Sequence, residues 1–274
     1  MQPRIKLADN SLSGAEALAR WTRNDNTMIY PGSFIPLFEK NGFCSKLDMY
    51  MFEKVCQQLR QWIDAGYEPV PISINQSKLT FYKSDYVERL CAILEKYQVP
   101  ASLIIIEILE SMSIDNVEEL NRHLDQLKAI GFQISMDDFG SGYSSLNTLA
   151  RLRIDEVKLD REFLMEAAGT SGKNIHLIIE QIVQLSKKLS VSTVIEGVET
   201  ESDDRFIKKI GCDNGQGYFY SRPIPADAFT REILLGEKLR PGIGWKTAIY
   251  AVARLNLRMA ETDTKKLKNK KMKK

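Results

Sequence analysis

The chain has 274 residues, of which 43% are hydrophobic and 27% are charged. This apolar content excludes a disordered chain, and the length fits one large domain better than two small ones. Seven of the 38 basic residues lie in residues 264–274, so the other 31 are outnumbered by the 36 acidic residues, and this larger part carries a net charge of −5. Such a charge is unsuited to a protein that wraps duplex nucleic acid.

Membrane-spanning and disulfide-rich proteins are also disfavoured. No apolar stretch approaches the roughly 18 residues of a membrane-spanning helix, so we expect no transmembrane segment in this chain. The four cysteines, Cys44, Cys56, Cys91 and Cys212, have no C-x-x-C spacing. We therefore expect reduced thiols in a cytoplasmic protein, with neither a zinc site nor a disulfide framework.

Short apolar runs alternate with helical patterns over residues 1–235. Strands are expected at residues 4–7, 14–18, 70–74, 103–108, 133–136, 156–159, 191–195 and 217–220. Helices, recognised by apolar residues at three- and four-residue spacing, are expected at residues 46–65, 117–130 and 175–189. Apolar strands that alternate with amphipathic helices indicate a parallel sheet covered by helices, and about eight of them fit a closed barrel.

The start of this barrel is expected to be irregular. Residues 8–13 are too few for a crossover helix, so the first two strands must form an antiparallel hairpin. The predicted fold class is therefore α/β, a modified (β/α)8 TIM-type barrel with an antiparallel first strand, over residues 1–235. Residues 236–263 are predicted to form a C-terminal helical extension, and residues 264–274 a disordered lysine-rich tail.

Polar residues follow the apolar strands where the strands end, which in such a barrel is the edge that carries the active site. In chain order they are Glu16, Asn75, Glu107, Glu110, Asp137, Asp138, Lys158, Asp160, Glu196, Glu199 and Gln216. A single acidic residue at such a position is usually a helix cap or a surface charge. Acids on most of the strands, however, would repel one another at one barrel mouth, and a bound multivalent cation resolves this conflict.

The donor types identify the class of cation. Carboxylates and an amide oxygen suit a hard ion such as Mg²⁺, Mn²⁺ or Ca²⁺, whereas the two histidines, His123 and His176, lie in helical patterns. The adjacent pair Asp137 and Asp138 offers one bridging carboxylate and a second ligand, as a two-metal site requires. Lys158 on the next strand can place a positive charge against an attacking water or a phosphate, so the pattern points to phosphoester hydrolysis.

Several runs of the chain resemble the EAL domain in order and spacing. They are Glu16-Ala17-Leu18-Ala19-Arg20-Trp21, Phe34-Ile35-Pro36, Asn75-Gln76-Ser77, Glu107-Ile108-Leu109-Glu110-Ser111, the loop of residues 137–146, Lys158-Leu159-Asp160, Glu196-Gly197-Val198-Glu199-Thr200 and Gln216-Gly217-Tyr218. The resemblance covers residues 2 to about 229 and implies a modified barrel whose first strand is antiparallel. It also implies a phosphodiesterase of bacterial second-messenger signalling that hydrolyses cyclic di-GMP to linear 5′-pGpG.

Carried over residue by residue, the resemblance implies a role for each motif. The first metal would be held by Glu16, Asn75, Glu107 and Asp137, and the second by Asp137, Asp138 and Glu196. Lys158 would orient the attacking water, and Glu196 would be the general base, a metal ligand or both. The nucleotide would contact Gln2, Leu18, Arg20, Asp160, Glu199, Gln216 and Pro223. Glu110 and Gly140 would support the loop that follows Asp138.

The resemblance also implies cofactors and partners. Two divalent cations, Mg²⁺ or Mn²⁺, would serve catalysis, and Ca²⁺ is expected to inhibit because its looser coordination sphere misplaces the water. A homodimer is expected. The chain is expected to belong to a longer cytoplasmic or membrane-tethered protein with an upstream sensory or GGDEF domain, because it starts late in the first strand of the family.

Two rival interpretations stay open. A catalytically inactive EAL domain would act as a cyclic-di-GMP receptor, but such domains typically lack a metal ligand or the lysine, and this chain retains them all. An unrelated metal-dependent barrel, such as a lyase acting on a carboxylated substrate, would share the acidic mouth. The Glu-Ala-Leu run and the Asp-Asp-Phe-Gly loop argue against that second interpretation.

Overall fold

The computed structural model describes residues 1–25, 27–113, 116–140, 146–167 and 172–236. The predicted lysine-rich tail and all but the first residue of the predicted helical extension lie outside these ranges. Within them, no helix combines the length and the apolar character that crossing a membrane requires.

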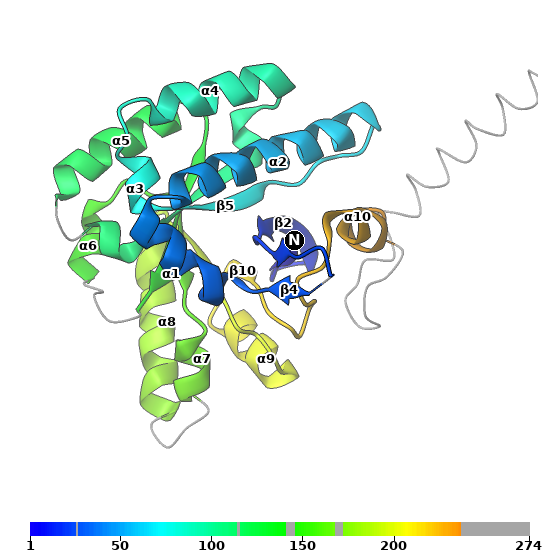
Figure 1. Ribbon diagram of the computed structural model, residues 1–274. Coiled ribbons are helices and arrows are strands. Elements are labelled where there is room, and N and C mark those ends of the chain that lie inside the picture. The colour runs from blue at the N-terminus through cyan, green and yellow to red at the C-terminus, as the bar shows by residue number, and fades with distance from the viewer. Residues whose placement is uncertain (26, 114–115, 141–145, 168–171, 237–274) are drawn as a thin grey trace, which may run out of the picture.

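Eight strands close into a barrel that helices surround (Figure 1). Their order around the barrel is β1 (Gln2–Lys6), β10 (Asn214–Gly215), β9 (Ser192–Ile195), β8 (Glu156–Leu159), β7 (Gln133–Phe139), β6 (Ile104–Leu109), β5 (Ile72–Gln76) and β2 (Ser11–Ala17). A separate hairpin pairs β3 (Trp21–Thr22) with β4 (Met28–Ile29). The closed barrel confirms the predicted fold class.

The helices pack their apolar faces on the outside of the barrel. They are α1 (Pro31–Asn41), α2 (Cys44–Asp64), α3 (Lys78–Phe81), α4 (Tyr86–Tyr97), α5 (Val117–Ile130), α6 (Leu146–Arg151), α7 (Glu162–Ala167), α8 (Gly172–Lys188), α9 (Glu201–Lys209) and α10 (Ala226–Phe229). Short 3-10 segments occur at Ala101–Leu103 and Glu110–Ser113, and a π-helical turn at Thr230–Leu234. Local sequence sets some boundaries: Asn116 caps α5, and Thr200 with Asp203 forms a capping box on α9.

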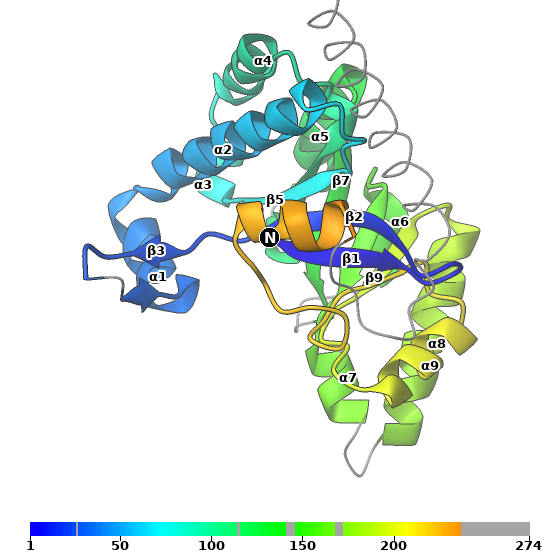
Figure 2. The ribbon, with the colours of Figure 1, turned by 90° about the vertical axis from the view of Figure 1, so that its right-hand side faces the viewer.

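The strand directions place one set of strand ends together. Strands β2, β5, β6, β7, β8, β9 and β10 run parallel to their neighbours in this series. Strand β1 is antiparallel to β2, with Gln2 opposite Glu16, and antiparallel to β10, with Ile5 opposite Gly215. The amino end of β1 therefore meets the carboxyl ends of the other strands at one mouth. Figure 2 shows α10 beside this amino end, where the Ile224 amide donates to the Met1 carbonyl at 2.8 Å.

One expected strand was wrong. The seven others lie within three residues of their expected bounds, but residues 217–220 form a turn, and the last strand is β10 at Asn214–Gly215. The amides of Tyr220 and Ser221 both donate to the Gly217 carbonyl at 3.1 Å. A β-carbon on Gly217 would lie 2.1 Å from the Val198 carbonyl oxygen, so this residue serves close backbone packing. The aromatic residues Tyr218, Phe219 and Tyr220 that follow it are typical of a strand, which is why a strand was expected. The β3–β4 hairpin was not expected.

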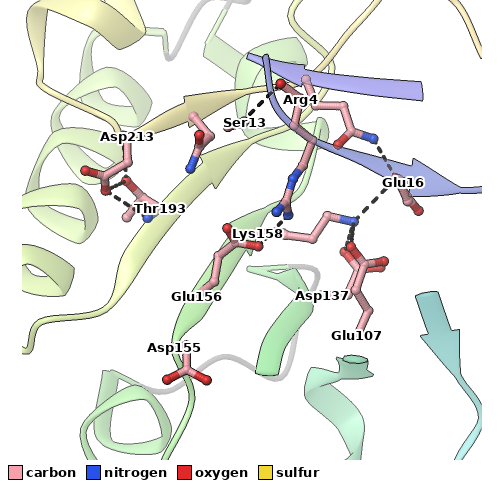
Figure 3. A network of polar contacts seen from close by, with 12 residues as sticks. Arg4, Ser13, Glu16, Glu107, Asp137, Asp155, Glu156, Lys158, Thr193 and Asp213 are labelled. Carbon is pink, nitrogen blue, oxygen red and sulfur yellow. Dashed lines mark hydrogen bonds and ion pairs between the residues drawn. The ribbon is translucent and has the colours of Figure 1, made fainter. Parts of the chain in front are cut away.

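Below the mouth, the barrel lumen holds a buried ion pair. Arg4 of β1 reaches across to Glu156 of β8, with 2.6 Å between Nη1 and Oε1 (Figure 3). The two strands are not neighbours in the sheet, so this contact crosses the interior. It lies on the same two strands that bring Gln2 and Lys158 to the mouth.

Candidate active site

The mouth of the barrel gathers the polar side chains that end the strands. They are Glu16 of β2, Asn75 of β5, Glu107 of β6, Asp137 and Asp138 of β7, Lys158 of β8, and Glu196 directly after β9. Because the strands are parallel and in register, Asn75 lies opposite Glu107, and Leu109 opposite Asp137. The sheet therefore converts residues scattered over 180 positions of sequence into one cluster.

Three carboxylates of this cluster converge on one point. Oxygens of Glu16, Glu107 and Asp137 all lie within 4.8 Å of one another, and the three side chains are buried. Asn75 joins them, because its Nδ2 donates to Glu16 Oε1 at 3.1 Å. Buried carboxylate oxygens at this spacing suit a hard divalent cation. The structure thus brings together all four residues predicted to hold the first metal.

Lys158 lies in the middle of the carboxylates and is 1% exposed. Its Nζ is 3.0 Å from Asp137, 3.2 Å from Glu107 and 3.7 Å from Glu16 (Figure 3). The same nitrogen is 2.7 Å from Glu196. Burial opposes the charged ammonium, but the surrounding carboxylates outweigh it and hold the pKa of Lys158 well above its ordinary value. One fixed positive charge therefore faces four acidic side chains.

The acids respond to burial in the opposite direction. Burial raises the pKa of Glu196 to about 7, although Lys158 opposes this shift. Burial also raises the pKa of Glu107 well above its usual range, and the neighbouring Glu16 and Asp137 add to the rise. Carboxyl groups with raised pKa values at the mouth of a barrel mark a site that a divalent cation would stabilise in its ionised form.

Asp138 lies beside the cluster and not within it. Its backbone adopts the left-handed conformation, with φ of 57°, and the β7–β8 register shifts between Met136 and Phe139. The Asp138 amide donates to Asp137 Oδ1 at 3.1 Å. Burial, followed by the charges of Asp137 and Asp160, raises the pKa of Asp138 to about 6. The irregular end of β7 therefore presents two adjacent acids to the same region, as a second metal position would need.

Predicted nucleotide-binding residues line two neighbouring pockets. One, of about 230 Å³, is lined by Gln2, Glu16, Leu18, Asp137, Arg161, Glu196, Gly197, Glu199, Gln216, Gly217 and Tyr218. The other, of about 580 Å³, includes Leu18, Arg20 and Pro223 in its wall beside α2. Leu18 lines both pockets, so they adjoin at that residue. We call the first of them the mouth pocket.

Hydrogen bonds tie the floor of the mouth pocket to the carboxylates. Gln216 Nε2 is 2.5 Å from Glu16 Oε2 and 3.4 Å from Gln2 Oε1. Gln2 Nε2 in turn donates to the Ser221 carbonyl at 3.2 Å. The side-chain amides of Gln2 and Gln216 are thus connected to Glu16, a predicted metal ligand.

Two further predicted nucleotide-binding residues have partners close in sequence. Asp160 lines neither pocket; its Oδ1 accepts a hydrogen bond from the Glu162 amide at 2.6 Å, at the start of α7. Arg20 donates to the Ala19 carbonyl at 2.7 Å, and its guanidinium lies 5.7 Å from the centroid of the Tyr30 ring. Arg20 nevertheless keeps a place in the wall of the second pocket.

Glu110 and Gly140 contact each other where the predicted supporting role requires it. The Gly140 amide donates to Glu110 Oε2 at 3.3 Å, and Glu110 is buried. Gly140 has φ of 101°, and a β-carbon there would lie 2.0 Å from the Phe163 ring. Only glycine fits this position without displacing Phe163. Residues 141–145 of the loop lie outside the described ranges.

Arg161 and Tyr218 line the mouth pocket, and neither was among the predicted site residues. Arg161 directly follows Asp160, and a β-carbon on Gly197 would lie 2.3 Å from Arg161 Cβ. Tyr218 belongs to the Gln216-Gly217-Tyr218 run but was assigned to a strand. The signal that could have identified Arg161 is its place directly after Asp160 at the end of a strand. Tyr218 was not considered as a site residue because residues 217–220 were predicted to form a strand.

Comparisons with known proteins agree with this geometry. The family model of the EAL domain matches residues 1–223. Among curated proteins, the bifunctional diguanylate cyclase/cyclic di-GMP phosphodiesterase MucR of Pseudomonas aeruginosa is 37% identical over 226 residues, which are 82% of this chain and 33% of MucR. The cyclic di-GMP phosphodiesterase NbdA of the same organism is 34% identical over 227 residues, covering 83% of this chain and 29% of NbdA. The chain therefore spans about a third of the length of these relatives.

A solved structure gives the same result at the level of the fold. The phosphodiesterase of PaMucR in complex with c-di-GMP superposes with a TM-score of 0.78 at 36% sequence identity. The superposition covers 83% of this chain and 92% of that chain.

Proposed function

Since the chain belongs to the EAL-domain family, we propose that it hydrolyses cyclic di-GMP to linear 5′-pGpG with the help of two divalent cations. The observation that carries this proposal is the convergence of Glu16, Glu107 and Asp137 around Lys158 at the mouth of the barrel. The names of MucR and NbdA and the c-di-GMP complex of PaMucR supply the substrate.

The metal ligands of the proposal come from adjoining strands. Glu16, Asn75, Glu107 and Asp137 would hold one ion, and Asp137, Asp138 and Glu196 the other. Their donors are carboxylate and amide oxygens, which suit Mg²⁺ or Mn²⁺, whereas Ca²⁺ is expected to bind and inhibit. When bound, such ions polarise the phosphoryl oxygens and acidify the attacking water.

Lys158 and Glu196 would handle charge and proton transfer. The Lys158 ammonium is held between Asp137 and Glu196, at 3.0 and 2.7 Å, where it can donate to the attacking water and offset charge on the phosphoryl oxygens. Glu196 would serve as a metal ligand, as the group that accepts a proton from the attacking water, or as both. Its contact with Lys158 keeps the accepting carboxylate beside the reacting centre.

The two adjoining pockets match a substrate made of two nucleotides. The mouth pocket, with Gln2, Glu199 and Gln216, would take one half of cyclic di-GMP next to the carboxylates. The second pocket, with Arg20 and Pro223, would take the other half. The scissile phosphate would then lie over the cluster, and Asp160, which interacts with Asp138, would line the nucleotide site beside it.

A homodimer is part of the proposal. Phe139, Gly140 and Phe163 line an apolar pocket of about 650 Å³ together with Leu177 and Ile178 of α8, which are exposed. This surface is continuous with the start of the loop that Glu110 supports. Leu177→Glu is expected to shift the protein from dimer to monomer in size-exclusion chromatography with light scattering. An unchanged mass would exclude α8 from the interface.

We also propose that the domain acts in the cytoplasm, downstream of a sensory or GGDEF domain in a longer protein. The relative MucR supports this proposal, because the chain covers 33% of MucR and the name of MucR includes a diguanylate cyclase activity besides the phosphodiesterase.

Product analysis tests the function directly. The purified chain is incubated with cyclic di-GMP and Mg²⁺ or Mn²⁺, and the products are separated by anion-exchange chromatography. We expect pGpG that disappears with EDTA and in Glu16→Ala, while circular dichroism shows both proteins folded. Tight binding of cyclic di-GMP without product would instead identify a receptor. A folded protein that neither binds nor hydrolyses cyclic di-GMP would overturn the proposal.

A further inference from the structure

Tyr218 is an aromatic residue of the mouth pocket that no role yet described uses. Tyr218 is 45% exposed, although it lies two residues after the buried Gln216. Tyr220, in the same turn, is buried and donates from its hydroxyl to Asp204 Oδ1 at 2.7 Å. In this turn Tyr220 is therefore part of the core, whereas Tyr218 lines the mouth pocket.

The backbone that carries Tyr218 is held rigidly. The backbone of Gly217 packs against that of Val198, because a β-carbon on Gly217 would lie 2.1 Å from the Val198 carbonyl oxygen. The Phe219 amide donates to the same Val198 oxygen at 2.9 Å, and the Ser221 amide donates to Gly217 at 3.1 Å. These backbone contacts on both sides of Tyr218 fix its place in the wall of the pocket.

A cation braces the ring. The Arg222 guanidinium carbon lies 4.3 Å from the centroid of the Tyr218 ring, a cation–π distance. Arg222 does not line the pocket, whereas Tyr218 does. The guanidinium therefore braces the Tyr218 ring without itself lining the mouth pocket.

The position of the ring relative to the carboxylates fits one nucleotide. Gln216, two residues earlier, donates to Glu16 at 2.5 Å, and Gln2 joins Gln216 to the Ser221 carbonyl of the turn. The turn is thus connected to the metal-ligand cluster by two amide side chains. A phosphate held at the carboxylates can leave its attached base in the mouth pocket, beside Tyr218.

We propose that Tyr218, braced by Arg222, is the platform on which one guanine base of the substrate stacks. This inference rests on the proposed function and adds a residue that sets affinity for the base. Stacking on an aromatic ring is a ground-state contact remote from the reacting phosphate, so it acts on KM and leaves kcat nearly unchanged. The phenol hydroxyl is not required, because the ring supplies the contact.

Steady-state kinetics of four proteins test the platform. In Tyr218→Leu, KM for cyclic di-GMP is expected to rise at least about fivefold, as loss of one base–aromatic stack predicts, with kcat within about twofold. Tyr218→Phe keeps the ring and is expected to restore the wild-type KM. Phe43→Leu is the matched control, since Phe43 is 43% exposed, has Lys46 over its ring at 5.4 Å and lines neither pocket.

The outcomes separate this inference from the proposed function. Turnover by the wild type with an unchanged KM in Tyr218→Leu would overturn the platform alone. A fall in kcat at constant KM, or a loss that Tyr218→Phe does not restore, would also overturn it. If the wild type binds without turnover, calorimetric Kd values for cyclic di-GMP replace KM in the same comparison. If it does not bind at all, both proposals are overturned.

Discussion

Two basic side chains, Arg4 and Lys158, lie inside the barrel, and their surroundings differ. Arg4 contacts the single carboxylate of Glu156 at 2.6 Å, whereas Lys158 has four carboxylates within 3.7 Å. Both side chains are almost completely buried. A matched pair balances its own charge, but one ammonium among four carboxylates leaves an excess of negative charge. The balance of charge, more than burial, therefore distinguishes a structural ion pair from a site that can take a further cation.

Neutralising one acid in each region gives the largest expected contrast. Glu16→Gln removes a ligand charge from the Lys158 cluster, and turnover should fall by at least about 100-fold, the upper range for residues that only support metal ligands. Glu156→Gln leaves the cluster intact and should keep turnover within about tenfold. Initial rates of pGpG formation at saturating Mn²⁺ measure both. Equal losses in the two variants would remove the distinction between the regions.

Removing Arg4 should cost stability. Arg4→Met leaves Glu156 buried without its partner, and the free energy of unfolding is expected to fall by about 3–5 kcal/mol. Urea titration followed by circular dichroism measures this loss. The double variant Arg4→Met/Glu156→Met removes both charges and should recover most of it. A double variant as unstable as the single one would show that the pair is not a closed unit.

The raised pKa of Glu196 predicts a pH dependence at the mouth. Between the ordinary value of 4.5 and about 7, the folded protein keeps a proton on Glu196 that the unfolded chain has released. This group therefore makes the EDTA-treated protein less stable as pH rises through that window. Melting temperatures at pH 5.5 and pH 8 measure the effect, and saturating Mn²⁺ should reduce it because the metal holds the carboxylates ionised.

Glu196→Gln is the control for this pH dependence. It removes the titrating group and should flatten the decline in melting temperature between the two pH values. A decline of the same size in Glu196→Gln would assign the effect to other carboxyl groups.

The smallest effect is expected at an exposed ion pair. Lys128 Nζ lies 2.6 Å from Asp155 Oδ1, but both side chains are about one third exposed. Lys128→Met should change the free energy of unfolding by no more than about 1 kcal/mol, because water screens this pair. Urea titration beside Arg4→Met makes the comparison. A loss as large as that of Arg4→Met would show that burial does not control the strength of these pairs.

Local patterns of the chain predicted most of the fold. Isoleucine-rich runs such as Ile104–Leu109 identify buried strands, and the short connection after β1 requires an antiparallel start. The failure at residues 217–220 has a tertiary cause. Phe219 and Tyr220 have the composition of a strand, but the close approach of Gly217 to Val198 turns the chain there. No residue near Gly217 in sequence reveals that contact.

The candidate site was predictable in its donors and less so in its contacts. Glu16, Glu107 and Asp137 were expected to share a metal, and the structure places them together. That Asp160 lines the nucleotide site stays a prediction; in the structure its Oδ1 accepts a hydrogen bond from the Glu162 amide at the start of α7. Tyr218 was missed because an exposed aromatic residue is recognised as a pocket wall only when its neighbours in space are known.

The sequence by itself determined the strand–helix alternation, the hairpin start and the oxygen donors of the site, because periodicity, connection length and donor chemistry are properties of the chain. The tertiary structure alone decided that Lys158 has four carboxylates within 3.7 Å while Arg4 pairs with Glu156, and that the Arg222 guanidinium lies over the ring of Tyr218. Those facts depend on how the barrel closes. Closure brings β1 and β8 across one lumen and sets distances that no spacing along the chain encodes.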